Sequence, residues 1–252
     1  MNNLVGISIG TIHLKGGTIN QRIEIAKKTG TKALEISFFK THELNQSFCQ
    51  SSKDYLKTLE YVSIHAPMFY EYSFFPSFNF NMEKLKKWYF FDADNKEDNP
   101  KKGQAIVFHP HQNIPASEEG MLFCVENMPP IPGKDFDLIK KLAEYKLAEH
   151  PEYRLILDAC HTLHFPGYLE ELVDKYHDRI QHVHLSDRRF NPTKKKTRDH
   201  QTFAECPDKD KFSYLRRLRC PIIAEISLGD SNPRECEDIL KREIDSIREF
   251  FS

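Results

Sequence analysis

Histidine, aspartate and glutamate residues stand at the ends of short apolar runs along most of this chain. The run in RLILDACH (154–161) ends on Asp158, with His161 three positions later, and SIHAP and VFHPH end on His65 and His109 in the same way. The pattern recurs in the runs LEIS, CVENM, IQHVHLSD and IIAEIS, which supply Glu35, Glu126, His182, His184, Asp187 and Glu225. A hydrogen-bonded structural role would explain any one of these residues alone. Their repetition as a set indicates a shared site.

The residue types indicate a metal centre. Burying several carboxylates together is unfavourable without a counter-charge, and a divalent cation supplies one. Imidazole nitrogens and carboxylate oxygens are ligands for zinc, manganese or iron(II). We therefore predict a metal site wherever these strand ends meet.

The elements that must position these residues are strands alternating with helices. Several of the β-rich runs are almost continuously apolar, as expected for strands covered on both faces. Amphipathic helical segments lie between most of them, at 18–30, 134–150, 167–180 and from 232 onward. The eight expected strands are 4–10, 32–39, 61–67, 104–111, 121–128, 154–161, 180–187 and 221–227.

This alternation predicts an α/β fold, a single (β/α)8 TIM barrel spanning residues 1–252. The connection between the fourth and fifth strands is too short for a full helix, so we expect one helix to be missing or reduced there. A barrel brings the C-terminal ends of its strands to one rim, where barrel enzymes keep their sites. The polar strand ends should converge at that rim.

Composition narrows the setting of the protein. The formal net charge is −1, which gives no overall attraction to nucleic acid or membrane, although a local patch could still bind either. No stretch reaches the roughly 20 apolar residues of a membrane span, and the start of the chain has no basic leader. We expect a cytoplasmic protein whose six cysteines are reduced.

The strand ends resemble those of the xylose isomerase-like TIM-barrel superfamily over essentially the whole chain. That superfamily includes AP endonucleases of the endonuclease IV type (family 2) and many sugar isomerases and epimerases. Its shared core is a glutamate, an aspartate, a histidine and a glutamate on the fifth to eighth strands. The residues that match this core are Glu126, Asp158, His184 and Glu225.

The endonuclease IV type adds further metal ligands, and the resemblance implies up to three zinc ions. His65, His109 and Glu126 would hold one, and Glu126 would bridge to a second held by Asp158, His184 and Glu225. His161 and His200 would hold the third, with or without Asp199. The endonuclease IV type carries D-x-H at this last point, whereas Asp199 and His200 are adjacent here. Neighbouring residues of an extended segment point to opposite sides.

Two chemistries suit such a site. In the first, clustered metals activate water and clamp a phosphodiester, with abasic DNA or a related phosphate ester as substrate, a DNA-repair function. The segment 188–198 would grip phosphates or would be a solvated loop. Its basic residues are Arg188, Arg189, Lys194, Lys195, Lys196 and Arg198. The aromatic segment 69–80 would stack on bases or cover the barrel mouth.

In the second chemistry one manganese or magnesium ion polarises a hydroxy-carbonyl sugar, and Glu126 and Glu225 are the catalytic residues that move a proton between adjacent carbons. The basic residues would then bind a sugar phosphate. A barrel that keeps its ligands without catalysis is a third possibility. His65 and His109 have no necessary role in an isomerase, so the sequence favours the hydrolase.

Overall fold

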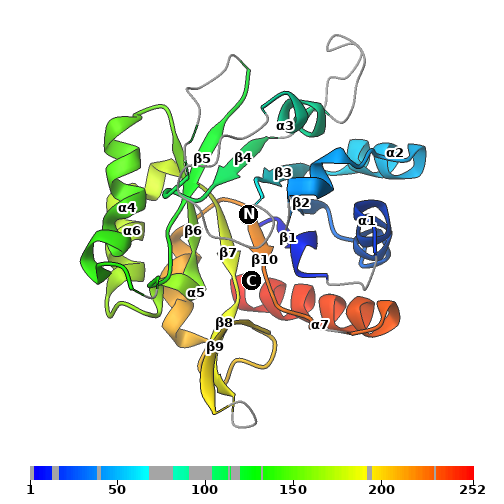
Figure 1. Ribbon diagram of the computed structural model, residues 1–252. Helices are drawn as coiled ribbons and strands as arrows, with labels where there is room; N and C mark the ends of the chain where they lie inside the picture. The colour runs from blue at the N-terminus through cyan, green and yellow to red at the C-terminus, as the bar shows by residue number, and fades with distance from the viewer. Residues whose placement is uncertain are drawn as a thin grey trace.

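Eight parallel strands close into a barrel, which confirms the predicted fold (Figure 1). The computed structural model describes residues 3–12, 17–38, 41–67, 82–90, 104–112, 114, 120–131, 133–191, 195–229 and 231–252. Around the barrel the strands follow the order β1, β10, β7, β6, β5, β4, β3, β2. Their bounds are β1 Val5–Ser8, β2 Ala33–Ser37, β3 Tyr61–His65, β4 Ala105–Phe108, β5 Phe123–Glu126, β6 Arg154–Asp158, β7 Ile180–Leu185 and β10 Ile222–Ala224.

Helices surround the strands in Figure 1. The α-helices are α1 Ile19–Lys28, α2 Gln50–Thr58, α3 Met82–Tyr89, α4 Phe136–Glu149, α5 Ala159–Thr162, α6 Tyr168–Tyr176 and α7 Pro233–Phe251. Short 3-10 helices occupy Ile9–Thr11, Thr41–Asn45, His177–Arg179 and Asp210–Arg217. Asn232 caps α7 by accepting the main-chain N–H groups of its first turn, and Pro233 then begins the helix with its φ already fixed. The described residues between β4 and β5 include no helix, as predicted.

The alternation of side chains along each strand explains how the polar rim arises. Outward residues pack against the helices, whereas inward residues fill the barrel with small apolar clusters, one of which contains Cys124 and Ile156. The next inward positions on those strands, two residues further, are Glu126 and Asp158. On β10 the apolar Ile223 is likewise followed by Glu225. Each strand therefore supplies apolar filling below and a ligand-type side chain above.

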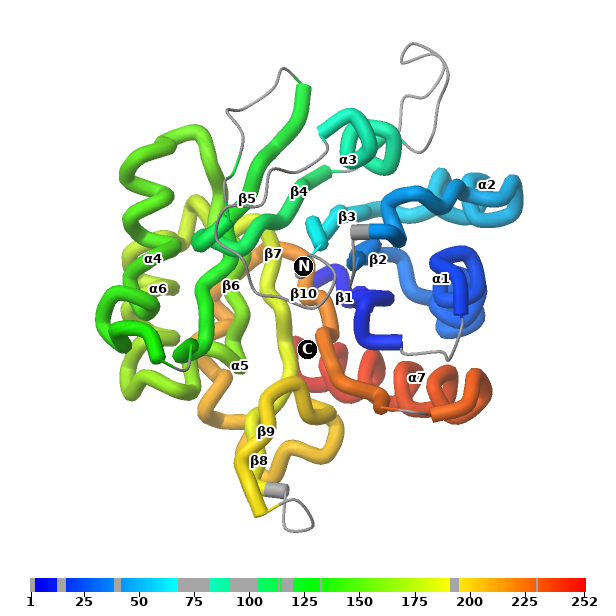
Figure 2. The backbone as a smooth tube through the Cα atoms, viewed as in Figure 1, coloured from blue at the N-terminus to red at the C-terminus, as the bar shows by residue number. Residues whose placement is uncertain are grey.

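The basic segment after β7 is a hairpin, where the sequence suggested a loop. Strands β8 (Asp187–Asn191) and β9 (Lys196–Gln201) pair antiparallel and project beyond the barrel strands (Figure 2). Asp187 anchors the base of this β8–β9 hairpin, because its buried carboxylate pairs with Lys211 Nζ at 2.5 Å and with Arg189 Nε at 3.1 Å. The hairpin is thus a positioned element at the barrel mouth.

Two expectations fall outside the described residues, namely the role of the aromatic segment 69–80 and that of Lys194. All six cysteines are free, without a disulfide. None of the helices in the described ranges combines the length and apolar character that spanning a membrane would require.

Candidate metal centre

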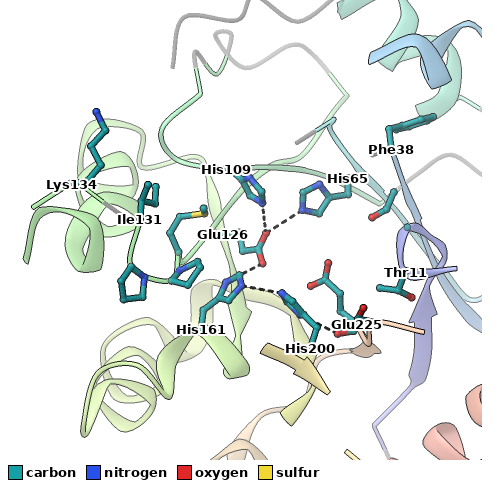
Figure 3. Close-up of a pocket in the computed structure, with 16 residues that line it drawn as sticks. Thr11, Phe38, His65, His109, Glu126, Ile131, Lys134, His161, His200 and Glu225 are labelled. Atoms are coloured by element: carbon teal, nitrogen blue, oxygen red, sulfur yellow. Dashed lines mark hydrogen bonds and ion pairs between the residues drawn. The ribbon is translucent and has the colours of Figure 1, made fainter. Parts of the chain in front are cut away.

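The polar strand ends meet at the floor of a cavity of about 800 Å³. Figure 3 shows His65 and His109 pointing at Glu126, with His161 facing His200 beside them. These residues and Glu225 all line the cavity. Asp158 and His184 are fully buried next to them.

Glu126 stands at the centre of the cluster. Its Oε2 lies 3.1 Å from His65 Nε2 and 3.2 Å from His109 Nε2. Its other oxygen, Oε1, lies 3.2 Å from His184 Nδ1. The two oxygens of one carboxylate therefore face two different sets of ligands.

Ligand atoms at the rim gather into three overlapping groups, each with its atoms within 4.8 Å of one another. We call them the first, central and third groups. The first is His65, His109 and Glu126; the central is Glu126, Asp158, His184 and Glu225; the third is Asp158, His161 and His200. The structure thus brings together the residues that the sequence proposed as metal ligands, apart from Asp199.

The spacing of Asp158 and His161 has a local cause. Asp158 ends β6 and caps α5, because its Oδ1 accepts the main-chain N–H of His161 at 2.8 Å. That cap turns His161 back over the strand end within one helical turn. The other oxygen, Oδ2, is buried and accepts no hydrogen bond from the described residues. It is therefore available to a cation.

Main-chain carbonyls set which nitrogen each histidine presents. In three histidines Nδ1 lies within hydrogen-bond distance of such an oxygen: His65 to Ala66 at 2.8 Å, His161 to Asn127 at 2.9 Å and His200 to Glu225 at 3.2 Å. Because a carbonyl only accepts, Nδ1 carries the proton in that bond, and Nε2 of the neutral ring presents its lone pair to the group.

The third group gives the clearest test of fit. Nε2 of His161 and Nε2 of His200 lie 3.3 Å apart. Two lone pairs that face each other at this distance repel unless a cation or a proton lies between them. With the free oxygen of Asp158 alongside, the donor set is two imidazoles and a carboxylate. These residues fit a divalent metal.

Charges within the central group shift the pKa values strongly. Burial raises the pKa of the Glu126 carboxyl, but the charge of His184 and hydrogen bonds from three histidines outweigh burial and hold it well below its usual range. For Asp158, burial and the charges of Glu126 and Glu225 together raise the pKa well above its usual range. Three carboxylates share a single imidazole in this group, so positive charge is in deficit, and a divalent cation would correct it.

Asp199 is placed differently from the sequence expectation. Its carboxylate accepts from His164 Nε2 at 2.9 Å and pairs with Arg188 Nε at 3.2 Å. Asp158 supplies the carboxylate of the third group in its place. The reason is that Asp199 and His200 are neighbours on β9 and direct their side chains to different partners. Sequence reasoning also missed His164, although its position three residues after His161 was a visible signal.

The basic residues of the β8–β9 hairpin divide into two kinds. Arg188 and Arg189 are engaged, the first with Asp199 and the second with Asp187 and Glu205. Lys195 and Lys196 are exposed, and Arg198 is half-buried. His200, on the same strand as Lys196, lines the cavity, which places the hairpin beside the candidate metal centre.

The walls of the cavity are apolar, and sequence reasoning did not identify them. Phe38 and Ile131 lie on opposite sides in Figure 3, and Ile131 ends the apolar run 128–131 that follows β5. Lys134 is the one cationic side chain other than histidine among the described lining residues. The Pro-rich run directly after a ligand-bearing strand was the available signal. Such walls would hold a non-reacting part of a substrate.

Comparisons with known proteins agree with this architecture. A D-allulose 3-epimerase from Methylomonas sp. superposes with a TM-score of 0.60 at 14% identity, covering 99% of this chain and 98% of that one. The probable 3-DHS dehydratase AsbF from Bacillus anthracis gives 0.60 at 15% identity, covering 98% of each chain. An AP endonuclease of family 2 from Brucella melitensis gives 0.56 at 14% identity, covering 95% and 97%. At these identities the similarity shows the fold.

No curated protein sequence matches the chain. The family model described as xylose isomerase-like TIM barrel matches residues 115–250, which carry Glu126, Asp158, His184 and Glu225. This match covers more than half of the chain. The chain belongs to the xylose isomerase-like TIM-barrel family.

Proposed function

We propose that this protein is a multinuclear metal-dependent phosphate ester hydrolase of the endonuclease IV type. The observation that carries the proposal is the position of Glu126, whose two oxygens face the first and the central group separately. Asp158 links the central and third groups in the same way. Shared carboxylates are what a cluster of several metals requires, whereas a single metal needs only the central group.

The three groups together would serve hydrolysis of a phosphodiester. Divalent metals bound there would lower the pKa of a water molecule and neutralise charge that develops on the phosphate oxygens. His65, His109, His161 and His200 would hold these metals through neutral imidazoles. Glu126, Asp158 and Glu225 would supply the negative charge that keeps them in place. This arrangement gives every histidine that lines the cavity a role.

Abasic DNA is the substrate that we propose. A cavity of about 800 Å³ is the size of a small-ligand pocket, so a duplex would have to place a single extruded nucleotide in it. Lys196 lies four residues before His200 on β9, which is about 13 Å along an extended strand. That length corresponds to about four steps of a DNA strand. Lys195, Lys196 and Arg198 would therefore contact phosphates flanking the lesion.

Zinc-loaded protein tests this function directly. It should cleave a duplex oligonucleotide with a single abasic analogue beside that site and leave the undamaged duplex intact. A matched Glu126→Gln variant should lose this cleavage. If the zinc-loaded wild type cleaves neither the abasic duplex nor a small activated phosphodiester, the hydrolase proposal fails.

A sugar isomerase or epimerase is the second candidate, favoured by one specific observation. Glu126 and Glu225 both line the cavity and belong to the same four-ligand group. Two carboxylates so placed could remove and return a proton on adjacent carbons of a sugar. Incubation of ketoses with the manganese-loaded protein in heavy water distinguishes the two functions. Incorporation of deuterium from solvent supports the isomerase, whereas cleavage of the abasic duplex without incorporation supports the hydrolase.

A further inference from the structure

A buried carboxylate lies inside the barrel, away from the three rim groups. Glu35, on β2, is fully buried and is not among the residues that line the cavity. Its Oε2 lies 3.0 Å from His184 Nε2, 3.4 Å from His182 Nε2 and 3.2 Å from Ser63 Oγ. Burying a charged group costs several kcal/mol, roughly, unless its partners compensate for the lost water. Glu35 therefore needs an explanation that the rim groups do not provide.

The hydrogen bonds around Glu35 specify the protonation of His184. An ionised carboxylate only accepts, so the nitrogen of His184 that lies 3.0 Å from it must carry a proton. His182 fits the same assignment. Tyr61 Oη lies 2.8 Å from His182 Nδ1 and can donate to it, which leaves the proton of His182 on Nε2, facing Glu35. Ser63 donates its hydroxyl proton to the same oxygen. Glu35 thereby receives a hydrogen bond from each neighbour.

His184 is reversed relative to the other histidines of the rim. His65, His161 and His200 donate from Nδ1 to main-chain carbonyls and present Nε2. His184 has its Nε2 on Glu35 and its Nδ1 at 3.2 Å from Glu126 and 3.0 Å from Glu225. We infer that Glu35 is a positioning residue that holds His184 with its proton on Nε2 and directs Nδ1 to the metal of the central group. A carboxylate behind a ligating imidazole also makes that imidazole a stronger donor.

This inference goes beyond the proposed function and depends only on a metal in the central group. Both the hydrolase and the isomerase need His184 as a ligand. A competing arrangement exists, because atoms of Glu35, His182 and His184 also lie within 4.8 Å of one another and could hold an ion themselves. Against it, all three side chains have no exposed surface, so a hydrated cation has no direct approach from the cavity. An ion there would also require both nitrogens of His184 to bind cations.

Zinc binding to Glu35→Gln tests the inference without any activity measurement. The variant keeps the shape of the side chain and removes its charge. We expect the same number of zinc ions at saturation, and one ion bound about 10- to 100-fold more weakly in competition with a chromophoric chelator. Glu35→Asp, which retains the charge, should recover part of that loss. Glu144→Gln is the matched control, since Glu144 is a buried carboxylate on α4 that pairs with Lys175 outside the barrel.

Three outcomes would overturn the inference. Unchanged zinc affinity with only lower thermal stability would mean that Glu35 is merely structural. One zinc ion fewer at saturation would make Glu35 a ligand. The third outcome comes from the wild type and so does not depend on the folding of any variant. Long-range proton–nitrogen correlation spectra of the zinc-loaded protein, assigned with His184→Ala, should show zinc on Nδ1 of His184, and zinc on Nε2 would refute the positioning role. Failure of the hydrolase proposal would appear separately, in the cleavage assay.

Discussion

Replacement of Glu126 by glutamine should remove one metal ion and weaken a second. Glu126 belongs to the first and the central group and not to the third. The amide has the size of the carboxylate, so the packing around this fully buried side chain is preserved. The amide lacks the negative charge that both groups use. The first group would keep two of its three ligands and the central group three of its four.

The expected magnitude follows from the number of ligands. Zinc sites with four ligands bind with about 10–16 kcal/mol, or about 2.5–4 kcal/mol for each ligand. Because a factor of ten in affinity corresponds to about 1.4 kcal/mol, losing one ligand weakens binding by about 10²- to 10³-fold. We therefore expect the variant to lose the zinc of the first group on gel filtration. The zinc of the central group should be held about 10²- to 10³-fold more weakly, and that of the third group unchanged.

Metal content by mass spectrometry, followed by titration with a chelator of known affinity, measures both effects. Glu43→Gln is the control, because Glu43 is a buried carboxylate that pairs with Arg22 at 2.6 Å outside the candidate metal centre. If Glu126→Gln binds as many zinc ions as the wild type with the same affinities, Glu126 does not bridge two metals. The argument from its two oxygens would then be wrong.

Three further predictions concern other parts of the molecule. His109→Ala should lose only the zinc of the first group, and a full zinc content measured for this variant would contradict that assignment. Alanine at Lys195, Lys196 and Arg198 together should weaken DNA binding and make the plot of log affinity against log salt shallower by roughly 2.7, about 0.9 for each phosphate contact; an unchanged slope would exclude the β8–β9 hairpin from the interface. Burial raises the pKa of Glu243 from its ordinary 4.5 to about 7, so the wild type should lose stability relative to Glu243→Gln as the pH rises through that interval. Chemical denaturation across the interval measures this difference, and parallel pH profiles would refute it.

Local features of the sequence were sufficient to predict the barrel and most of the candidate ligands. Side chains alternate along a strand, so an apolar run that ends in a polar residue places that residue inward at the strand end. The topology of parallel strands then brings all such ends to one rim. Asp158 and His161 were predictable for the same reason, because a capping residue and the residue three positions later meet within one turn.

The tertiary structure alone decided how these residues are shared among groups. Whether Asp158 or Asp199 joins His161 and His200 depends on how β6 and β9, elements distant in the chain, lie against each other. The position of Glu35 beneath His184 depends likewise on the register around the closed barrel, where β2 and β7 are not neighbours. The sequence by itself determined which side chains point inward at the rim, because that follows from the geometry of each strand. It could not determine which atoms meet, because hydrogen-bond distances of about 3 Å are set by packing between segments more than a hundred residues apart.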